Sequence, residues 1–201
     1  MTALLRLSHW IDSFSEWIGK TIRWLVLGAV LISAGNAIIR KAFNIGSNAF
    51  LEIQWYLFAG VFMLGVGFVF MRNAHVRIDF ISARLSERTN AIIDVAGMLI
   101  FTIPLSLIMI SLSWPLFHNA WVSGEMSQNA GGLIRWPVLL LIPVGFSLLL
   151  AQCASELIKR LAFLGGHRAH PFSVDPTAKS DEERLAEELA EAAAKKQQEA
   201  R

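Results

Sequence analysis

Long apolar runs without charge alternate with charged segments along most of this chain. No Asp, Glu, Lys or Arg occurs in residues 24–39 or 53–71, and two further runs cover about 91–113, with Asp94 near the start, and 136–155. A helix that crosses about 30 Å of hydrocarbon needs about 20 residues and satisfies its own backbone there. The pattern predicts an all-α integral membrane protein with four transmembrane helices. We place them at about 23–40, 53–71, 91–113 and 136–156, within a membrane domain of residues 23–160.

Residues 1–22 show a second pattern, in which apolar and polar positions alternate with the period of a helix. The apolar positions are Leu7, Trp10, Ile11, Phe14, Trp17, Ile18 and Ile22. This spacing predicts an amphipathic helix that lies in the membrane interface ahead of the first span. The alternative is that these residues simply extend that span.

Lys and Arg are unevenly distributed around the four runs. Ten lie in the amino-terminal segment, the second connection and the residues just after the fourth run, whereas three lie in the first and third connections. Because cytoplasmic segments carry an excess of these residues, both termini are predicted to be cytoplasmic. The third connection then faces the periplasm.

Residues 161–201 become increasingly polar and end in a stretch rich in Ala and Glu. Ser180 and Glu183 have the spacing of a helix capping box, so part of this stretch is expected to be helical. It has few large apolar residues and cannot form a core by itself. We predict a polar, mostly mobile cytoplasmic tail.

Composition narrows the classes of function. The net charge of +2 does not favour nucleic acid as a partner, and basic residues beside apolar runs suit membrane phospholipids instead. Cys153 is the single cysteine, so an intramolecular disulfide or a thiolate metal site cannot form. None of the five histidines lies in the middle of a run, which disfavours haem. We expect no metal and no cofactor.

The predicted spans are nearly free of ionisable residues, whereas proton relays and ion pathways need such groups at membrane depth. The chain therefore resembles a scaffold more than a conduit. His75 and Asp79 form an H-x-x-x-D pattern in which His could act as a base, which leaves a stand-alone membrane enzyme as an alternative. We favour a charged cluster of Arg72, His75, Arg77 and Asp79 beneath the bilayer. A structural or electron-transfer subunit of a respiratory complex is a further alternative.

Two ladders of small residues recur every four positions. They are Ala29, Ser33 and Ala37 on the first run, and Ser147, Ala151 and Ser155 on the fourth. Small side chains let helices approach closely in lipid, so both ladders are candidate surfaces for helix packing or subunit contact.

Several motifs occur in the order and spacing of a known family. They are the run 52–58 (EIQWYLF), Gly65, the run 72–79 (RNAHVRID), the outer stretch 124–133 (GEMSQNAGGL), Trp136-Pro137, Gln152 and Glu156. Across about residues 20–160 the chain resembles the small permease subunits of TRAP transporters, the DctQ-type family. The long polar tail departs from the compact pattern of that family.

The resemblance implies a non-enzymatic subunit in the bacterial inner membrane. Its partners would be a large multi-span permease subunit of the DctM type, which moves an organic acid with sodium, and a periplasmic substrate-binding protein. Glu52 would begin the second span at the outer surface, and Arg72, Asn73, His75, Arg77 and Asp79 would mark its cytoplasmic exit. Possible docking residues for the binding protein are Glu125, Ser127, Asn129 and Gly132.

Overall fold

The computed structural model describes residues 2–44, 46–72 and 85–167, and these residues are helical with short connections. The elements are α1 (Thr2–Phe43), α2 (Asn48–Met71), α4 (Glu87–Gly97), the π-helical turn η1 (Met98–Thr102), α5 (Ile103–Ser123) and α6 (Trp136–Leu164). No strand occurs in this part of the chain. Four helices are long and apolar enough to cross a membrane, with α4, η1 and α5 forming one of them. The predicted all-α, four-span architecture is confirmed.

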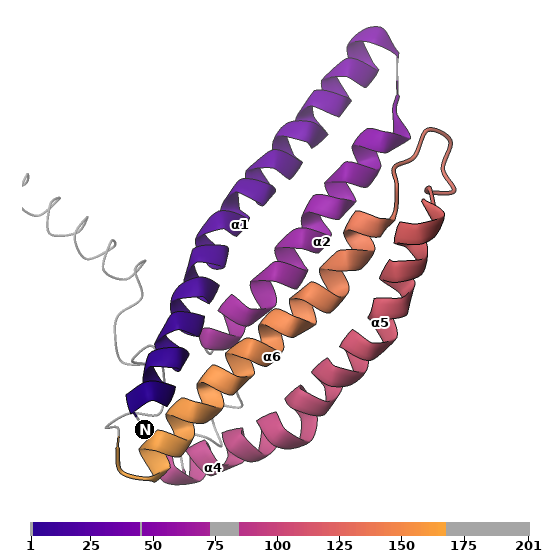
Figure 1. Cartoon of the computed structure of the whole chain (residues 1–201). Helices are drawn as coiled ribbons and strands as arrows, with labels where there is room; N and C mark the ends of the chain where they lie inside the picture. Colours follow the sequence, from indigo (N-terminus) through magenta and orange to yellow (C-terminus); the bar gives the residue numbers. More distant parts are fainter. Residues whose placement is uncertain (1, 45, 73–84, 168–201) are drawn as a thin grey trace, which may run out of the picture.

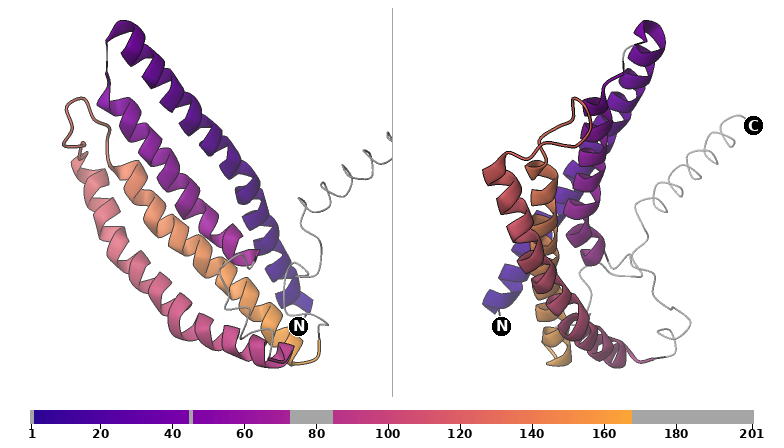
Figure 2. Two further views of the ribbon diagram at one scale, coloured as in Figure 1. Left: turned by 180° about the vertical axis from the view of Figure 1, so that it is seen from behind. Right: turned by 90° about the vertical axis from the view of Figure 1, so that its right-hand side faces the viewer.

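The helices lie side by side in one twisted layer, in the order α1, α2, α6, α5 (Figures 1 and 2), and the first part of α1 also packs directly against the end of α6. Because the layer has no second layer packed on it, large apolar side chains remain exposed, such as Phe62 at 73% and Phe101 at 71%. The few fully buried side chains lie between neighbouring helices and include polar ones such as Gln152 and Glu156. So much exposed apolar surface is typical of contact with lipid or with another subunit.

Helix α1 is continuous from the amphipathic segment into the first span. Its 42 residues make it about 63 Å long, which is well above the hydrocarbon thickness of about 30 Å. The polar positions Ser8 and Ser15 are buried, whereas Trp10 and Trp17 on the apolar side are exposed. The segment thus continues the span, as in the alternative interpretation. Its position in a membrane interface stays a prediction.

The observed helices extend beyond the uncharged runs. Helix α2 begins at Asn48 and includes Glu52, and α6 continues through Glu156 to Leu164. The second predicted span begins after Glu52 and the fourth ends at Glu156, but both carboxylates have partners within the layer, and the helices continue past them. Helix α4 begins after Ser86, whose Oγ accepts from the backbone N–H of Thr89 at 3.2 Å.

The third span is curved (Figure 1). The π-helical turn η1 immediately precedes Pro104, which lacks a backbone N–H and cannot donate to the turn before it. The loss of that hydrogen bond and the wider turn account for the bend. Because of this bend, α4 and α5 lie along the length of α6, and α4 contacts the carboxyl-terminal part of α6.

The beginning of α1, the beginning of α4 and the end of α6 lie at one end of the layer (Figure 1). The turn between α1 and α2 and the connection 124–135 lie at the other end. The two ends correspond to the two sides that the Lys and Arg distribution distinguishes. Which end faces the cytoplasm stays a prediction. Asn73, His75, Arg77, Asp79 and the tail from residue 168 lie outside the described residues, so the predictions for them are untested.

Candidate functional site

Glu52 organises the connection between α5 and α6, residues 124–135. It lies one turn into α2, yet only 4% of its surface is exposed. Its Oε1 accepts from Ser127 Oγ and from Asn129 Nδ2, the latter at 2.7 Å. Its Oε2 accepts from the backbone N–H of Leu133 at 2.6 Å. One carboxylate therefore holds three points of the connection, and hydrogen bonds to a charged acceptor are among the strong ones.

Two neighbours of Glu52 on the same face of α2 hold the connection as well. Asn48 Nδ2 donates to the carbonyl of Ala130 at 3.0 Å, and Tyr56 Oη donates to the carbonyl of Ile134 at 3.2 Å. The spacing of four residues places all three side chains in line along the helix. At the base of the connection, the rings of Trp121 and Trp136 pack edge to face at 4.5 Å between centroids.

The glycines of this connection are required by its shape. Gly124 ends α5 with φ +62°, and Gly131 has φ +70°, a region that favours glycine. A Cβ on Gly132 would lie 2.6 Å from Ser127 Cβ and 2.8 Å from Glu52 Oε1. Close approach of this backbone to the carboxylate therefore excludes any side chain at position 132.

The four residues predicted to dock a binding protein have different surroundings. Ser127, Asn129 and Gly132 lie against Glu52 and position the connection. Glu125 forms an exposed ion pair with Arg135, next to the exposed side chain of Met126. Glu125 and Met126 are therefore part of the outward surface of the connection, together with the exposed residues 128–131, and docking itself stays a prediction.

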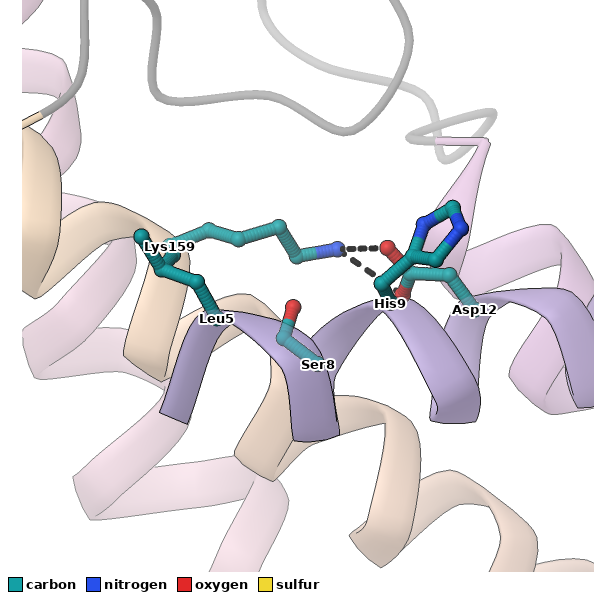
Figure 3. A pocket seen from close by; sticks show the side chains of 5 residues that line it. All are labelled: Leu5, Ser8, His9, Asp12 and Lys159. Atoms are coloured by element: carbon teal, nitrogen blue, oxygen red, sulfur yellow. Dashed lines mark hydrogen bonds and ion pairs between the residues drawn. The ribbon is translucent and has the colours of Figure 1, made fainter. Parts of the chain in front are cut away.

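A second polar cluster ties α1 to α6 at the opposite end. Lys159 Nζ lies 2.9 and 2.8 Å from the two carboxylate oxygens of Asp12 (Figure 3). Gln152 Nε2 donates to Asp12 Oδ1 at 2.8 Å, and Ser155 Oγ donates to the same oxygen at 2.7 Å. Ser15 Oγ donates to Gln152 Oε1 at 2.7 Å. The polar face of α1 is thus matched by a polar face of α6.

The charges continue from this cluster to α4. Lys159 also pairs with Glu156 at 2.5 Å, Glu156 pairs with Arg160, and Arg160 Nε lies 3.1 Å from Asp94 Oδ2. The side chains of Glu156, Lys159 and Arg160 are each at most 4% exposed. Asp94, the single acidic residue noted within a predicted span, is therefore one end of a buried chain of ion pairs that joins α1, α6 and α4. Among the described residues, no buried side-chain polar atom lacks a hydrogen-bond partner.

This chain of ion pairs was not predicted from the sequence, although the sequence carries a signal for it. Lys159 and Arg160 were counted only as indicators of orientation. On α6 the polar residues Gln152, Ser155, Glu156, Lys159 and Arg160 recur with helical spacing and form one stripe. Such a stripe on a helix that continues an apolar span predicts a polar partner within the protein.

The small open pocket beside Lys159 offers little for catalysis. It has a volume of about 250 Å³ and is lined by Leu5, Ser8, His9, Asp12 and Lys159 (Figure 3). Lys159 is held by both carboxylate oxygens of Asp12 and by Glu156, so its amine is committed to ion pairs. Within residues 2–44, 46–72 and 85–167, no three His, Cys, Asp or Glu side chains are grouped to hold a metal.

The small-residue ladders are only partly inside the layer. Ala29 and Ser155 are buried between helices, and Ser33 is half-buried. Ala37, Ser147 and Ala151 are exposed. The exposed pair on α6 lies on an outward face of a helix that occupies the middle of the layer. Contact of this face with another subunit stays a prediction.

A single layer of four apolar helices, stabilised by polar clusters at both ends, defines a multi-pass membrane protein. The family model for the DctQ component of tripartite ATP-independent periplasmic transporters matches residues 29–163, and the chain belongs to this family. A search of the curated proteins and a search of the solved structures each found no match. The predicted family is confirmed, and with it a role as the small membrane subunit of a TRAP transporter. The family is a transporter component and works with a DctM subunit and a substrate-binding protein.

Proposed function

We propose that this chain holds the large DctM-type subunit in place and helps to dock the substrate-binding protein. The transporter is then a sodium-driven uptake system for organic acids in the bacterial inner membrane. Both termini of the chain lie in the cytoplasm, and the connection 124–135 lies in the periplasm. Family membership supports the kinds of partner, and the uneven distribution of Lys and Arg supports the orientation.

One observation carries the proposed scaffold role: the described residues form a single layer of helices with many large apolar side chains exposed. Phe62 on α2 and Phe101, in the π-helical turn of the third span, are among the most exposed. A layer of this kind encloses no path across a membrane and offers broad apolar surfaces to a larger neighbour. Helices in lipid associate by packing and by polar contacts, and both are available on α6.

The buried charges support the same role. The charged groups of the cluster that joins α1, α6 and α4 are engaged by neighbours of opposite charge, as in the pairs of Lys159 with Asp12 and of Arg160 with Glu156. A transport pathway needs polar groups that can exchange partners with the transported solute or ion. Groups locked to one another stabilise a rigid arrangement of helices instead.

Reconstitution tests the proposed function. Vesicles that contain the large subunit, with binding protein, a sodium gradient and a labelled organic acid outside, are compared with and without this chain. We expect uptake only when both membrane subunits are present, and no uptake by this chain alone. Full uptake by the large subunit without this chain would contradict the scaffold role.

A substitution on the exposed face of α6 that carries Ser147 and Ala151 tests whether this face contacts the large subunit. Ala151→Leu adds bulk where we expect a helix of the large subunit to pack, and overpacking of this kind costs about 1–3 kcal/mol. We expect less large subunit to co-purify with the variant in mild detergent. Ala34→Leu, the same change at an exposed position of α1 outside the ladder, serves as the matched control. Equal co-purification with both variants would exclude this face as the contact.

A substitution of the exposed residue Glu125 tests whether the connection docks the binding protein. Glu125→Lys replaces the ion pair with Arg135 by two adjacent positive charges and reverses the charge at this position on the outward surface of the connection. Since charges at the rim of an interface act mainly on association rates, we expect slower uptake when binding protein is limiting and recovery when it is abundant. Glu87→Lys, at the opposite end of the layer, is the control. Unchanged uptake at limiting binding protein would refute the docking role.

A further inference from the structure

An apolar groove runs between α1 and α2 on the surface of the layer. Its volume is about 430 Å³, and every residue that lines it is apolar or glycine. The lining extends from Gly19 and Ile22 on α1 along two turns of α2, from Val61 to Val69. No described segment of the chain covers this groove.

Two glycines let α1 and α2 pack closely along the floor of the groove. A Cβ on Gly19 would lie 2.5 Å from the ring of Phe68, so the ring rests directly on the backbone of α1. A Cβ on Gly65 would lie 3.3 Å from Ile22 Cδ1. The two helices therefore touch at both glycines, and the groove above this contact is a narrow slot lined by apolar side chains and glycine.

The slot has a positively charged rim at one end. The guanidinium of Arg72, the residue that caps α2, lies over the ring of Phe68 with 5.3 Å from Cζ to the ring centroid. Lys20 and Arg23 follow the lining residues Gly19 and Ile22 in sequence, and both are exposed. Glu16 pairs with Lys20 at 3.1 Å, so the rim retains a net positive charge.

We propose that this groove binds one anionic phospholipid, with an acyl chain in the slot and the phosphate at Arg72. Basic residues next to an apolar surface at the end of a span match the two parts of such a molecule. An α-helix about 10 Å across would fill this volume within about one turn, although the slot follows two turns of α2. A flexible acyl chain suits a long, narrow slot better. The inference does not depend on the proposed function.

Native mass spectrometry of the full-length chain in mild detergent tests this proposal, with phosphatidylglycerol as the probe and phosphatidylcholine as the neutral comparison. We expect one phosphatidylglycerol to bind per chain in preference to phosphatidylcholine. Arg72→Gln should weaken the binding of phosphatidylglycerol about five-fold, because one cation is lost at the headgroup. Val69→Trp should abolish binding by filling the slot.

Each variant has a matched control on α1. Arg40→Gln removes a cation at the opposite end of α1, and Val30→Trp adds the same bulk at an exposed position outside the slot. Both controls should bind lipid as the unaltered chain does. Phosphatidylglycerol with a photoreactive acyl chain should label the peptide that contains residues 61–69, which locates the site without any substitution. Equal binding by all four variants, equal binding of the two lipids, or labelling confined to α4, α5 and α6 would overturn the proposal.

Discussion

Lys159→Met should destabilise the protein more than any other single substitution that keeps side-chain volume similar. The change leaves the carboxylates of Asp12 and Glu156 without their shared cation in a site where Glu156 is almost fully buried. Removal of one partner from a buried pair costs about 3–5 kcal/mol, because the remaining charge is uncompensated. We expect a large drop in the thermal unfolding temperature of the purified chain in detergent.

The exposed pair of Lys20 and Glu16 provides the control for this result. Their side chains are 63% and 43% exposed, and surface pairs contribute about 0–1 kcal/mol. The Lys20→Met variant should therefore have a thermal unfolding temperature close to that of the unaltered chain. The double change Asp12→Asn with Lys159→Met should recover part of the loss, since the side chain of Asp12, which loses its cation, becomes neutral, while Glu156 still pairs with Arg160. If Lys159→Met and Lys20→Met unfold at the same temperature, the chain of ion pairs does not stabilise the layer.

Glu52→Ala should release the connection 124–135 while the helices stay folded. The substitution removes the acceptor for Ser127, Asn129 and the backbone N–H of Leu133 at once. A hydrogen bond to a charged group contributes about 1.5–3 kcal/mol, which corresponds to about ten- to hundred-fold faster amide exchange at Leu133. Because the connection is proposed to contact the binding protein, we expect uptake to fall as well.

The measurement is hydrogen–deuterium exchange of the peptide that covers residues 124–135. Glu125→Gln, which weakens only the exposed pair with Arg135, should leave exchange at Leu133 almost unchanged. Glu52→Gln keeps one oxygen acceptor but adds an amide that faces existing donors, so we expect an intermediate rate. Protection at Leu133 that survives Glu52→Ala would show that other contacts, such as those of Asn48 and Tyr56, suffice to hold the connection.

The number and kind of helices were predictable because they depend on local composition. Each span is a continuous apolar segment, and the hydropathy of the sequence identifies such a segment even when its contacts in the structure are not known. The extent of the helices was not predictable by the same rule. The second predicted span begins after Glu52 and the fourth ends at Glu156, yet both residues lie inside helices, because donors elsewhere in the layer pair with their carboxylates. The number and position of charged residues in the sequence do not show whether such a residue has a partner elsewhere in the structure.

The two polar clusters were predictable to different degrees. Glu52 was singled out because it begins a motif of the family, although its partners 75 to 81 positions later were not identified. Asp12 and Lys159 are 147 positions apart, and nothing in the local pattern of either residue specifies the other. The helical spacing of polar residues on each helix indicates that a polar partner exists. Only the arrangement of α1 against α6 reveals which residue it is.

The most direct test of the scaffold role is a pull-down of this chain from native membranes in mild detergent, followed by mass spectrometry of the proteins that accompany it. We expect a large multi-span membrane protein of the DctM type in an amount equal to this chain, held through the apolar faces of the layer. A chain that purifies alone and remains monodisperse, while uptake in the same membranes persists after its removal, would contradict the account.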